Sequence, residues 1–279
     1  MVRRRPLLLT GVVLLTAAIV ILALSRKEFP PASRPSPVVR RIDRIRQTLF
    51  DEVQPVKLAN CTLRRFGEAN DGGYLLCGNL LRAVQAGYSY GISGYDGWGC
   101  DVSIRVHVKV HQYDCFDLRH PSCPAGDTVF HAECIGDRSR VEDGRPFDTL
   151  AAQIGKNGDS ARRVVVKMDV EGAEWDSLLT APEEVLNRID QLAVEFHRVD
   201  SDEAIAVVQR LKQFFFVVHL HFNNNSCDPG LKPFPAWAFE VLFVNRKLGV
   251  LNSTAPARSL EPIDAPNNPA VPDCQSAGP

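Results

Sequence analysis

The chain has no excess of charge of either sign, and this absence argues against one large group of functions. Its 279 residues contain 32 Lys and Arg against 33 Asp and Glu, a formal net charge of -1. Proteins that bind DNA or RNA through the phosphate backbone gain much of their affinity from an excess of positive charge. We therefore expect no nucleic-acid partner.

The sequence also lacks several short motifs. It has no C-x-x-C pair, no G-x-G-x-x-G dinucleotide pattern and no G-x-x-x-x-G-K-[ST] phosphate loop. A zinc ribbon, a thioredoxin-type redox site and a P-loop therefore have little support. Disulfides in an oxidising compartment explain the eight cysteines better, with small buried free cysteines as the alternative. Cys61 and Cys77 flank a hairpin-like stretch and could be partners, whereas the other pairings stay open.

The first 39 residues differ from the rest of the chain. Residues 3–5 are arginines and precede an uncharged apolar run, residues 6–24. In a helix this run is about 28 Å long, enough to cross a bilayer. The positive-inside rule predicts a type II signal anchor, with residues 1–5 in the cytosol and a proline-rich stalk at residues 25–39. A cleaved signal peptide is the alternative, because residues 23–25 carry small side chains at the places that signal peptidase reads.

This topology predicts where the folded part lies. We expect a single-pass type II membrane protein whose domain, residues 40–255, faces the lumen of the Golgi or endoplasmic reticulum, or the periplasm if the chain is bacterial. At least one of the three N-x-S/T sequons is then expected to be glycosylated. These sequons are Asn60, Asn224 and Asn252. Residues 256–279 are proline-rich and predicted to be a disordered tail.

Short apolar runs alternate with helical patterns inside the domain. The runs have the length of strands and are rich in Val, Ile, Phe or Tyr. They are residues 87–92, 109–113, 128–134, 163–168, 191–196, 215–222 and 238–244. The alternation predicts an α/β fold with a mostly parallel seven-stranded sheet, helices on both of its sides, and an antiparallel hairpin formed by the last two strands.

Two helices can be predicted in more detail. The clearer one begins at Asp200, with Glu203 three residues later as its capping-box partner. Its apolar face consists of Ala204, Val207, Val208 and Leu211. A second helix follows residue 169 and ends before Pro182.

Polar residues and glycines follow the first two predicted strands. In open parallel sheets, ligands bind beyond the carboxyl ends of the strands. Gly91, Gly94 and Asp96 belong to a loop in which a ligand can lie against the backbone, although an ordinary turn is the alternative. Asp114 ends the second strand, where a carboxylate can accept both hydroxyls of a ribose. Together these features predict an adenosine-type ligand.

The segment VVVKMDVEGAEW, residues 164–175, is the strongest local signal. Asp169, Glu171 and Glu174 crowd a strand end and the first turn of a helix. Carboxylates at this place stabilise a helix N-terminus, and they also suit a cationic ligand.

This segment resembles the FkbM-type methyltransferases and the related methyltransferase-like proteins. Their recurring K-[IM]-D-[VI]-E-G-[AS]-E pattern corresponds to residues 167–174, and NDGGYLLC at residues 70–77 and LAVEFH at residues 192–197 are similar to the same group. The resemblance spans about residues 67–245. It implies a class I, Rossmann-like methyltransferase fold with S-adenosylmethionine as the methyl donor. The residues expected to bind this cofactor are Gly91, Gly94, Asp96, Asp114, Asp169 and Glu171.

Two candidate catalytic residues alternate on the next strand. Glu195 and His197 lie two positions apart and therefore point to the same side of an extended chain. Methyl transfer to a hydroxyl requires removal of its proton, which a histidine with a pKa near 6.5 can accept. We predict His197 as the base, Glu195 as the residue that orients it, and an acceptor hydroxyl on a glycan, a lipid or a small molecule. A histidine that is merely fixed by hydrogen bonds is the alternative.

We expect no bound metal, because His219 and His221 share a face but have no third ligand at a suitable spacing.

Two other functions stay open. A Golgi-type glycosyltransferase has the same build and needs acidic residues to hold a divalent metal. The only D-x-D is Asp200-Ser201-Asp202, which a helix cap explains more simply. The second alternative is a non-catalytic luminal binding protein that keeps the methyltransferase fold, since the first glycine loop departs from the usual G-x-G-x-G form.

Overall fold

The computed structural model describes residues 36–252 and 263–274. The predicted anchor at residues 6–24 and the stalk up to residue 35 lie outside these residues. Among the helices that are described, none is both long and apolar enough to cross a membrane. Helix α1 begins at Pro37, so the last three residues of the expected stalk are helical instead of extended.

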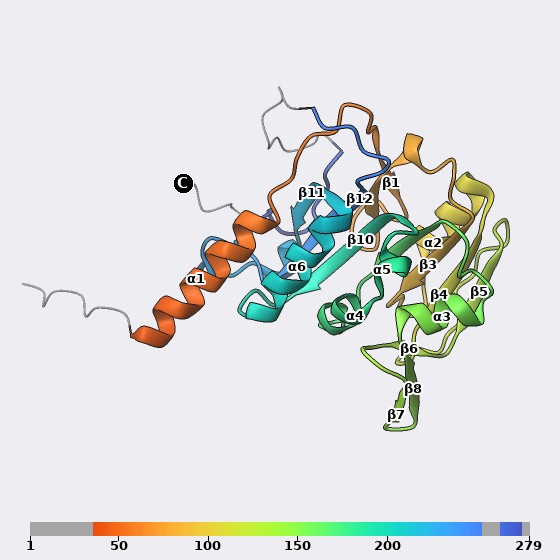
Figure 1. The fold of residues 1–279 in the computed structure, drawn as a ribbon, viewed down its shortest axis with the longest axis horizontal. Helices are drawn as coiled ribbons and strands as arrows, with labels where there is room; N and C mark the ends of the chain where they lie inside the picture. The colour runs from red at the N-terminus through yellow and green to blue at the C-terminus, as the bar shows by residue number, and fades with distance from the viewer. Residues whose placement is uncertain (1–35, 253–262, 275–279) are drawn as a thin grey trace, which may run out of the picture. The chain divides into compact units, whose positions relative to one another are not determined.

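A seven-stranded sheet forms the centre of the folded unit, as predicted (Figure 1). Its order is β11-β12-β10-β9-β3-β4-β5, and among the described strands of this sheet β12 alone runs in the direction opposite to the others. The strands are β3 (Ala86–Tyr90), β4 (Lys109–Tyr113), β5 (Thr128–His131), β9 (Val164–Met168), β10 (Ile189–His197), β11 (Phe215–Phe222) and β12 (Ala238–Asn245). All seven predicted strands and the terminal antiparallel pair are confirmed. The chain therefore has a mixed α/β fold that is compatible with a Rossmann-like arrangement.

The two faces of this sheet are covered differently. Val164, Val166 and Met168 of β9 belong to one apolar core, together with residues of helices on that face. These helices are α1 (Pro37–Glu52), α3 (Leu150–Lys156), α4 (Glu174–Thr180), α5 (Glu183–Leu186) and α6 (Asp202–Phe214). The opposite face, to which Val165 points, is covered by the short helix α2 (Gly97–Val102) and the hairpin β1–β2 (Leu63–Phe66, Tyr74–Cys77). The prediction of helices on both sides therefore holds only in part.

Helix α6 shows how the sequence determines a local element. Its buried residues are the four predicted ones, Ala204, Val207, Val208 and Leu211. The cap differs from the prediction, because the side chain of Ser201 accepts hydrogen bonds from the N–H groups of Glu203 and Ala204. Asp200 and Asp202 instead pair with Arg46 and Arg41 of α1. The only D-x-D therefore joins two helices.

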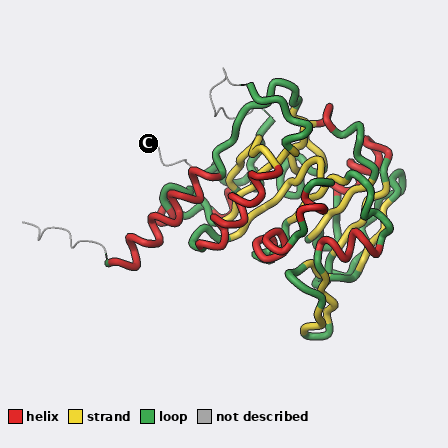
Figure 2. The backbone as a smooth tube through the Cα atoms, viewed as in Figure 1, coloured by secondary structure: helices red, strands yellow, loops and turns green. Residues whose placement is uncertain are grey.

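A small second sheet was not predicted. It contains β6 (Cys134–Ile135), β8 (Arg145–Asp148) and β7 (Arg140–Glu142), and it extends away from the large sheet as a narrow ribbon (Figure 2). The expected strand at residues 128–134 is split, because the chain leaves the large sheet after His131. The strands of this second sheet are too short to show an apolar periodicity that can be recognised in the sequence.

Four disulfides join all eight cysteines. The predicted pair Cys61–Cys77 is confirmed, and it closes the base of the β1–β2 hairpin. The other pairs are Cys100–Cys123, Cys115–Cys134 and Cys227–Cys274. This number of disulfides indicates an oxidising compartment.

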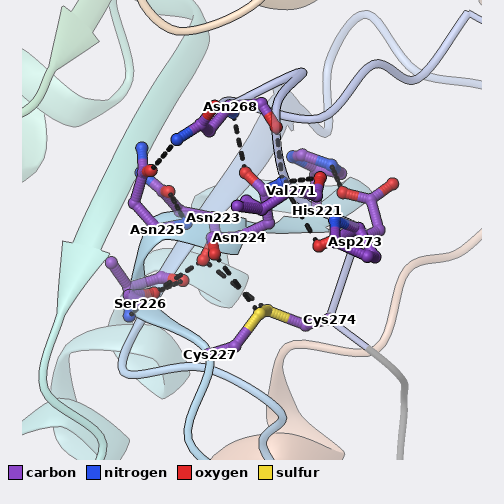
Figure 3. The surroundings of a disulfide bond; sticks show 12 residues. His221, Asn223, Asn224, Asn225, Ser226, Cys227, Asn268, Val271, Asp273 and Cys274 are labelled. Atoms are coloured by element: carbon purple, nitrogen blue, oxygen red, sulfur yellow. Dashed lines mark hydrogen bonds and ion pairs between the residues drawn. A yellow bond between two sulfur atoms is a disulfide. The ribbon is translucent and has the colours of Figure 1, made fainter.

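The C-terminal segment at residues 263–274 is packed on the domain, so the expectation of a disordered tail is wrong for these residues. The Cys227–Cys274 disulfide ties its end to the loop after β11 (Figure 3). Asn224 Nδ2 donates to the carbonyl oxygens of Asn268 and Val271. Proline content suggested an unpacked chain, whereas the cysteine and these backbone acceptors fix it in place.

This packing also affects one of the sequons. Asn224 is buried, and its amide nitrogen lies beneath the C-terminal segment (Figure 3). A glycan on that nitrogen would have to displace the segment. The glycosylation prediction therefore depends on Asn60 and Asn252, of which Asn60 is half-buried and donates its side-chain N–H to the Leu248 carbonyl oxygen.

Candidate functional site

A cavity among the described residues lies where the strand order reverses. The chain proceeds from β3 to β4 and β5 on one side, and returns to β9 and β10 on the other. A cavity of about 220 Å³ opens beyond the carboxyl ends of β3, β4 and β9. Such a reversal point is where ligands bind in open α/β sheets.

Four of the six predicted cofactor-binding residues line this cavity. They are Gly91, Asp114, Asp169 and Glu171. Gly94 does not line it and lies beside the Asp117 and Arg119 side chains. Asp96 is turned away from it, because its carboxylate caps α2 at the N–H of Gly99 and accepts a hydrogen bond from Gln112. Asp96 therefore has a structural role in this fold.

Gly91 is required by the backbone at this point. Its φ is +70°, and a Cβ there would collide with the carbonyl oxygen of Asp169. The loops after β3 and β9 therefore approach each other more closely than any larger residue would allow. This approach brings the two sides of the strand-order reversal together at the cavity.

Asp114 is saturated by backbone donors. Its Oδ2 accepts the N–H groups of Ile92 at 3.0 Å and Ser93 at 2.7 Å. Its Oδ1 accepts those of Phe116 at 2.9 Å and Asp117 at 3.0 Å. A carboxylate offers about four acceptor positions, and all four are taken. This does not favour the predicted bidentate contact with a ribose, and it assigns Asp114 to holding two loops of the cavity.

An apolar wall of the cavity was missed by the sequence analysis. It consists of Phe116, Ile135, Phe147 and Val170, next to the Cys115–Cys134 disulfide. Phe116 is 74% exposed, and the guanidinium of Arg145 lies 4.4 Å from the centre of its ring. Ile135 and Phe147 come from the unpredicted β6–β8–β7 sheet, so no pattern in the sequence places them at the cavity.

A cluster of carboxylates adjoins the cavity on its β9–β10 side. The Tyr74 hydroxyl lies 3.0 Å from Asp169 Oδ2 and 3.2 Å from Glu195 Oε2. Asn223 Nδ2 donates to Glu195 Oε1 at 2.7 Å. Lys167 Nζ lies 3.6 Å from Asp169 Oδ2. Tyr74 and Asn223 were not predicted as site residues, although Tyr74 lies in the NDGGYLLC motif.

His197, the predicted base, lies in the same cluster. Its Nδ1 lies 3.1 Å from Glu174 Oε1, and its Nε2 faces Glu171, Asp169 and Glu195 at 3.5, 3.9 and 3.9 Å. Burial opposes the charged imidazole, but the neighbouring carboxylates outweigh it and raise the pKa of His197 to about 9. The ring is then already protonated at neutral pH, which does not favour the prediction of a histidine base with a pKa near 6.5.

The pKa of Glu195 is also displaced. Burial, together with the negative charges of Asp169 and Glu240, raises it to about 8. Carboxylates are therefore concentrated here beyond what the local cations neutralise.

The NDGGYLLC motif has a structural explanation on its N-terminal side. Asn70 Nδ2 donates to Pro266 O, and the Asp71 N–H donates to Asn267 O. Asn267 in turn donates to Glu240 at 2.8 Å. The motif therefore anchors the C-terminal segment on one side and presents Tyr74 to the carboxylates on the other.

No protein-family model matches the chain, and a search of curated proteins finds no significant match.

Proposed function

We propose that this protein is an S-adenosylmethionine-dependent methyltransferase that methylates a hydroxyl group, with a class I methyltransferase fold. The observation that carries the proposal is the cavity at the strand-order reversal of a seven-stranded sheet with one antiparallel strand. In that fold the sheet is parallel except for one strand. This strand is inserted next to the edge strand and runs in the opposite direction. The resemblance of residues 167–174 to the FkbM-type motif supports the same reading.

The lining of the cavity fits the parts of this cofactor. Phe116, Ile135 and Phe147 offer apolar surface for a planar base. The loop at Gly91 lets a ligand lie close against the backbone. Asp169 and Glu171 lie at the other end, where carboxylates would stabilise a cationic sulfonium.

The protein's own groups would orient and deprotonate the acceptor. The cofactor would supply an electrophilic methyl group. As the acceptor oxygen forms its bond to this methyl group, the S–C bond would break and the sulfur would keep its electron pair. The hydroxyl proton must go to a nearby acceptor, and the carboxylate of Asp169, which lines the cavity next to the Glu195 carboxyl group, can accept it. Tyr74 holds both carboxylates in place, and this fixed geometry contributes to the rate by positioning.

The rival functions have less support. A glycosyltransferase would need free carboxylates for a metal–nucleotide complex, but Asp200 and Asp202 pair with arginines of α1. A non-catalytic binding protein would not need the buried group of carboxylates beside the cavity, whose burial costs free energy.

We also propose that the domain lies in the lumen of the secretory pathway behind the N-terminal anchor. The four disulfides support an oxidising compartment. The anchor rests on the sequence of residues 6–24 alone.

Calorimetry with the full chain in detergent tests the proposed function. We expect S-adenosylmethionine to bind and a nucleotide sugar not to bind. Phe116→Ala should weaken cofactor binding about tenfold, because the variant removes apolar surface from the base-binding wall. Leu118→Ala is the matched control, since Leu118 is exposed nearby but does not line the cavity. Binding of the nucleotide sugar alone, or equal affinity in all forms, would overturn the proposal.

A further inference from the structure

Three side chains at the ends of β9 and β10 converge on one point. Asp169, Glu195 and His197 each offer a ligand atom, and these atoms lie within 4.8 Å of one another. Bond lengths of about 2.0–2.2 Å to a divalent ion place neighbouring ligand atoms about 3–4 Å apart. The separations of 3.9 Å from His197 Nε2 to Asp169 Oδ1 and to Glu195 Oε1 are within this range.

The orientation of His197 is fixed as in a metal ligand. Its Nδ1 is held by Glu174, a residue with no exposed side-chain surface, which also accepts the His197 backbone N–H. Metal-bound histidines commonly use one ring nitrogen for such a carboxylate and the other for the metal. The side chain is only 6% exposed, yet within the part of the chain that the structure describes Nε2 has no hydrogen bond. It is therefore a buried nitrogen directed at two carboxylate oxygens without a bonded partner.

The two carboxylates are also oriented from behind. The Tyr74 hydroxyl contacts Asp169 Oδ2 and Glu195 Oε2, the oxygens that are turned away from the histidine. The remaining oxygens, Asp169 Oδ1 and Glu195 Oε1, face His197 Nε2. Asn223 donates to Glu195 Oε1 and occupies one of its two lone pairs. One lone pair stays available for a ligand.

The negative charge at this point favours the binding of a cation. Four carboxylates, those of Asp169, Glu171, Glu174 and Glu195, lie within 3.9 Å of the His197 ring nitrogens. Lys167 is the lysine that approaches them, at 3.6 Å from Asp169. Glu174 and Glu195 are buried and Asp169 is partly exposed, whereas Glu171 is exposed. A cation that binds among charges of one sign stabilises them, and the buried ones most strongly.

We propose that Asp169, Glu195 and His197 bind one divalent transition-metal ion, such as Mn²⁺ or Zn²⁺, at the side of the cavity. One imidazole nitrogen and two carboxylate oxygens suit such ions better than Ca²⁺ or Mg²⁺, which prefer oxygen ligands only. This site differs from the sequence expectation of no metal, because its ligands lie on two separate strands and have no recognisable spacing. Three protein ligands leave coordination positions open toward the cavity.

The role of the ion rests on the proposed function, whereas its binding does not. In a hydroxyl methyltransferase the open positions would hold the acceptor oxygen next to the methyl group and lower the pKa of the hydroxyl. A polyhydroxyl acceptor with two adjacent oxygens, as in a sugar, would match two open positions. Asp169 lines the cavity as well as the cluster, so an acceptor held there adjoins the proposed cofactor position.

Titration of the full chain, stripped of metal by a chelator, with Mn²⁺ alone tests the site without any cofactor or acceptor. We expect one ion per chain, followed by electron paramagnetic resonance, and a pulsed spectrum that contains coupling to an imidazole nitrogen. His197→Gln and Glu195→Gln should each weaken binding at least about tenfold. His111→Gln is the matched control, because His111 is equally buried on the same sheet but belongs to a different group of side chains.

Each outcome separates this inference from the proposed function. Absence of Mn²⁺ and Zn²⁺ binding to the wild type, or bound Mn²⁺ without nitrogen coupling, would overturn the metal site even if S-adenosylmethionine binds. Tight metal binding without S-adenosylmethionine binding would support the site and contradict the proposed function. The wild-type spectrum decides the matter if a variant fails to fold. Folded ligand variants with unchanged affinity would also overturn the site.

Discussion

Asp114 and Asp169 occupy equivalent places in the sequence pattern but different environments in the structure. Each follows the last residue of a parallel strand, Asp114 after β4 and Asp169 after β9. The Asp114 carboxylate accepts four backbone N–H groups. Among the described residues, the Asp169 carboxylate has no backbone donor and is approached instead by Tyr74, Lys167 and His197.

This difference distinguishes a carboxylate that holds the backbone in place from one that can take part in the reaction. A carboxylate whose acceptor positions are filled by the backbone holds the chain in place, and little of it remains for a ligand. A carboxylate that is surrounded by side chains keeps an oxygen available and can respond to what binds. We therefore assign the shape of the cavity to Asp114 and its chemistry to Asp169. Three variants test this assignment, and a fourth tests the packing of the C-terminal segment.

The largest effect is expected from Asp169→Asn. The variant keeps the shape of the side chain and removes its charge, so turnover should fall by about 10²–10⁴. The melting temperature should change little, because no backbone group loses its partner. Release of S-adenosylhomocysteine with a panel of hydroxyl acceptors measures the turnover. Loss of folding without any specific loss of turnover would make Asp169 the structural residue.

Asp114→Ala should have the opposite profile. Removal of the carboxylate leaves four backbone N–H groups without their acceptor, and we expect a loss of about 3–5 kcal/mol in the free energy of unfolding. Urea denaturation measures this loss, with Asp169→Asn as the control. A stability equal to that of the wild type, combined with a specific loss of cofactor affinity, would restore the ribose-binding role predicted from the sequence.

Tyr74→Phe should lower turnover as well, but less than Asp169→Asn does. The variant removes the hydroxyl that contacts Asp169 and Glu195 but keeps the buried ring. We expect about a tenfold fall in turnover, equivalent to about 1.4 kcal/mol, with cofactor affinity unchanged. Steady-state kinetics and calorimetry on one preparation separate the two quantities. If affinity falls as much as turnover, Tyr74 shapes the cavity instead of orienting the carboxylates.

The smallest effect concerns the C-terminal segment and depends on pH. Burial opposes protonation of His221, but Glu240, Asp264 and Asp273 outweigh it and raise its pKa above the ordinary 6.5, while His219 stacks beside it. A raised pKa contributes stability that is complete below pH 6.5 and is lost as pH rises through the folded-state value. The pKa of Glu240 is lowered in spite of burial, chiefly by His221, so its contribution is lost only well into the acid range.

His221→Gln should therefore cost about 1 kcal/mol near pH 6 and less at pH 9. Thermal denaturation at the two pH values measures the difference. His120→Gln is the control, because His120 is exposed and lies outside the segment. A cost that does not change with pH would show that His221 acts by packing alone.

The strands were predictable because their sequences are continuous and apolar. The nine residues of β10 are all buried, since both faces of the sheet are covered, and its apolar stretch LAV followed by Phe196 is recognisable without a structure. The same reasoning located Glu195 and His197 on one side of that strand. Gly91, Asp114, Asp169 and Glu171 were found because strand ends are where ligands bind.

The remaining features depend on contacts between distant parts of the chain. Sequence alone does not reveal that Asp114 is saturated by backbone donors, because its four partners are positioned by two loops. The wall formed by Ile135 and Phe147 depends on strands too short to show periodicity. The position of the C-terminal segment depends on Cys274, whose partner was one of many possible pairings.

The most direct test of the central claim is a crystal structure of the protein with S-adenosylhomocysteine. The account predicts the adenine against Phe116 and Phe147, the backbone of the Gly91 loop around the ligand, and the sulfur near Asp169. The Asp114 carboxylate should keep its four backbone donors in the complex. Ligand density at another place on the molecule, or a ribose bound by Asp114 after the loops have moved, would contradict the account.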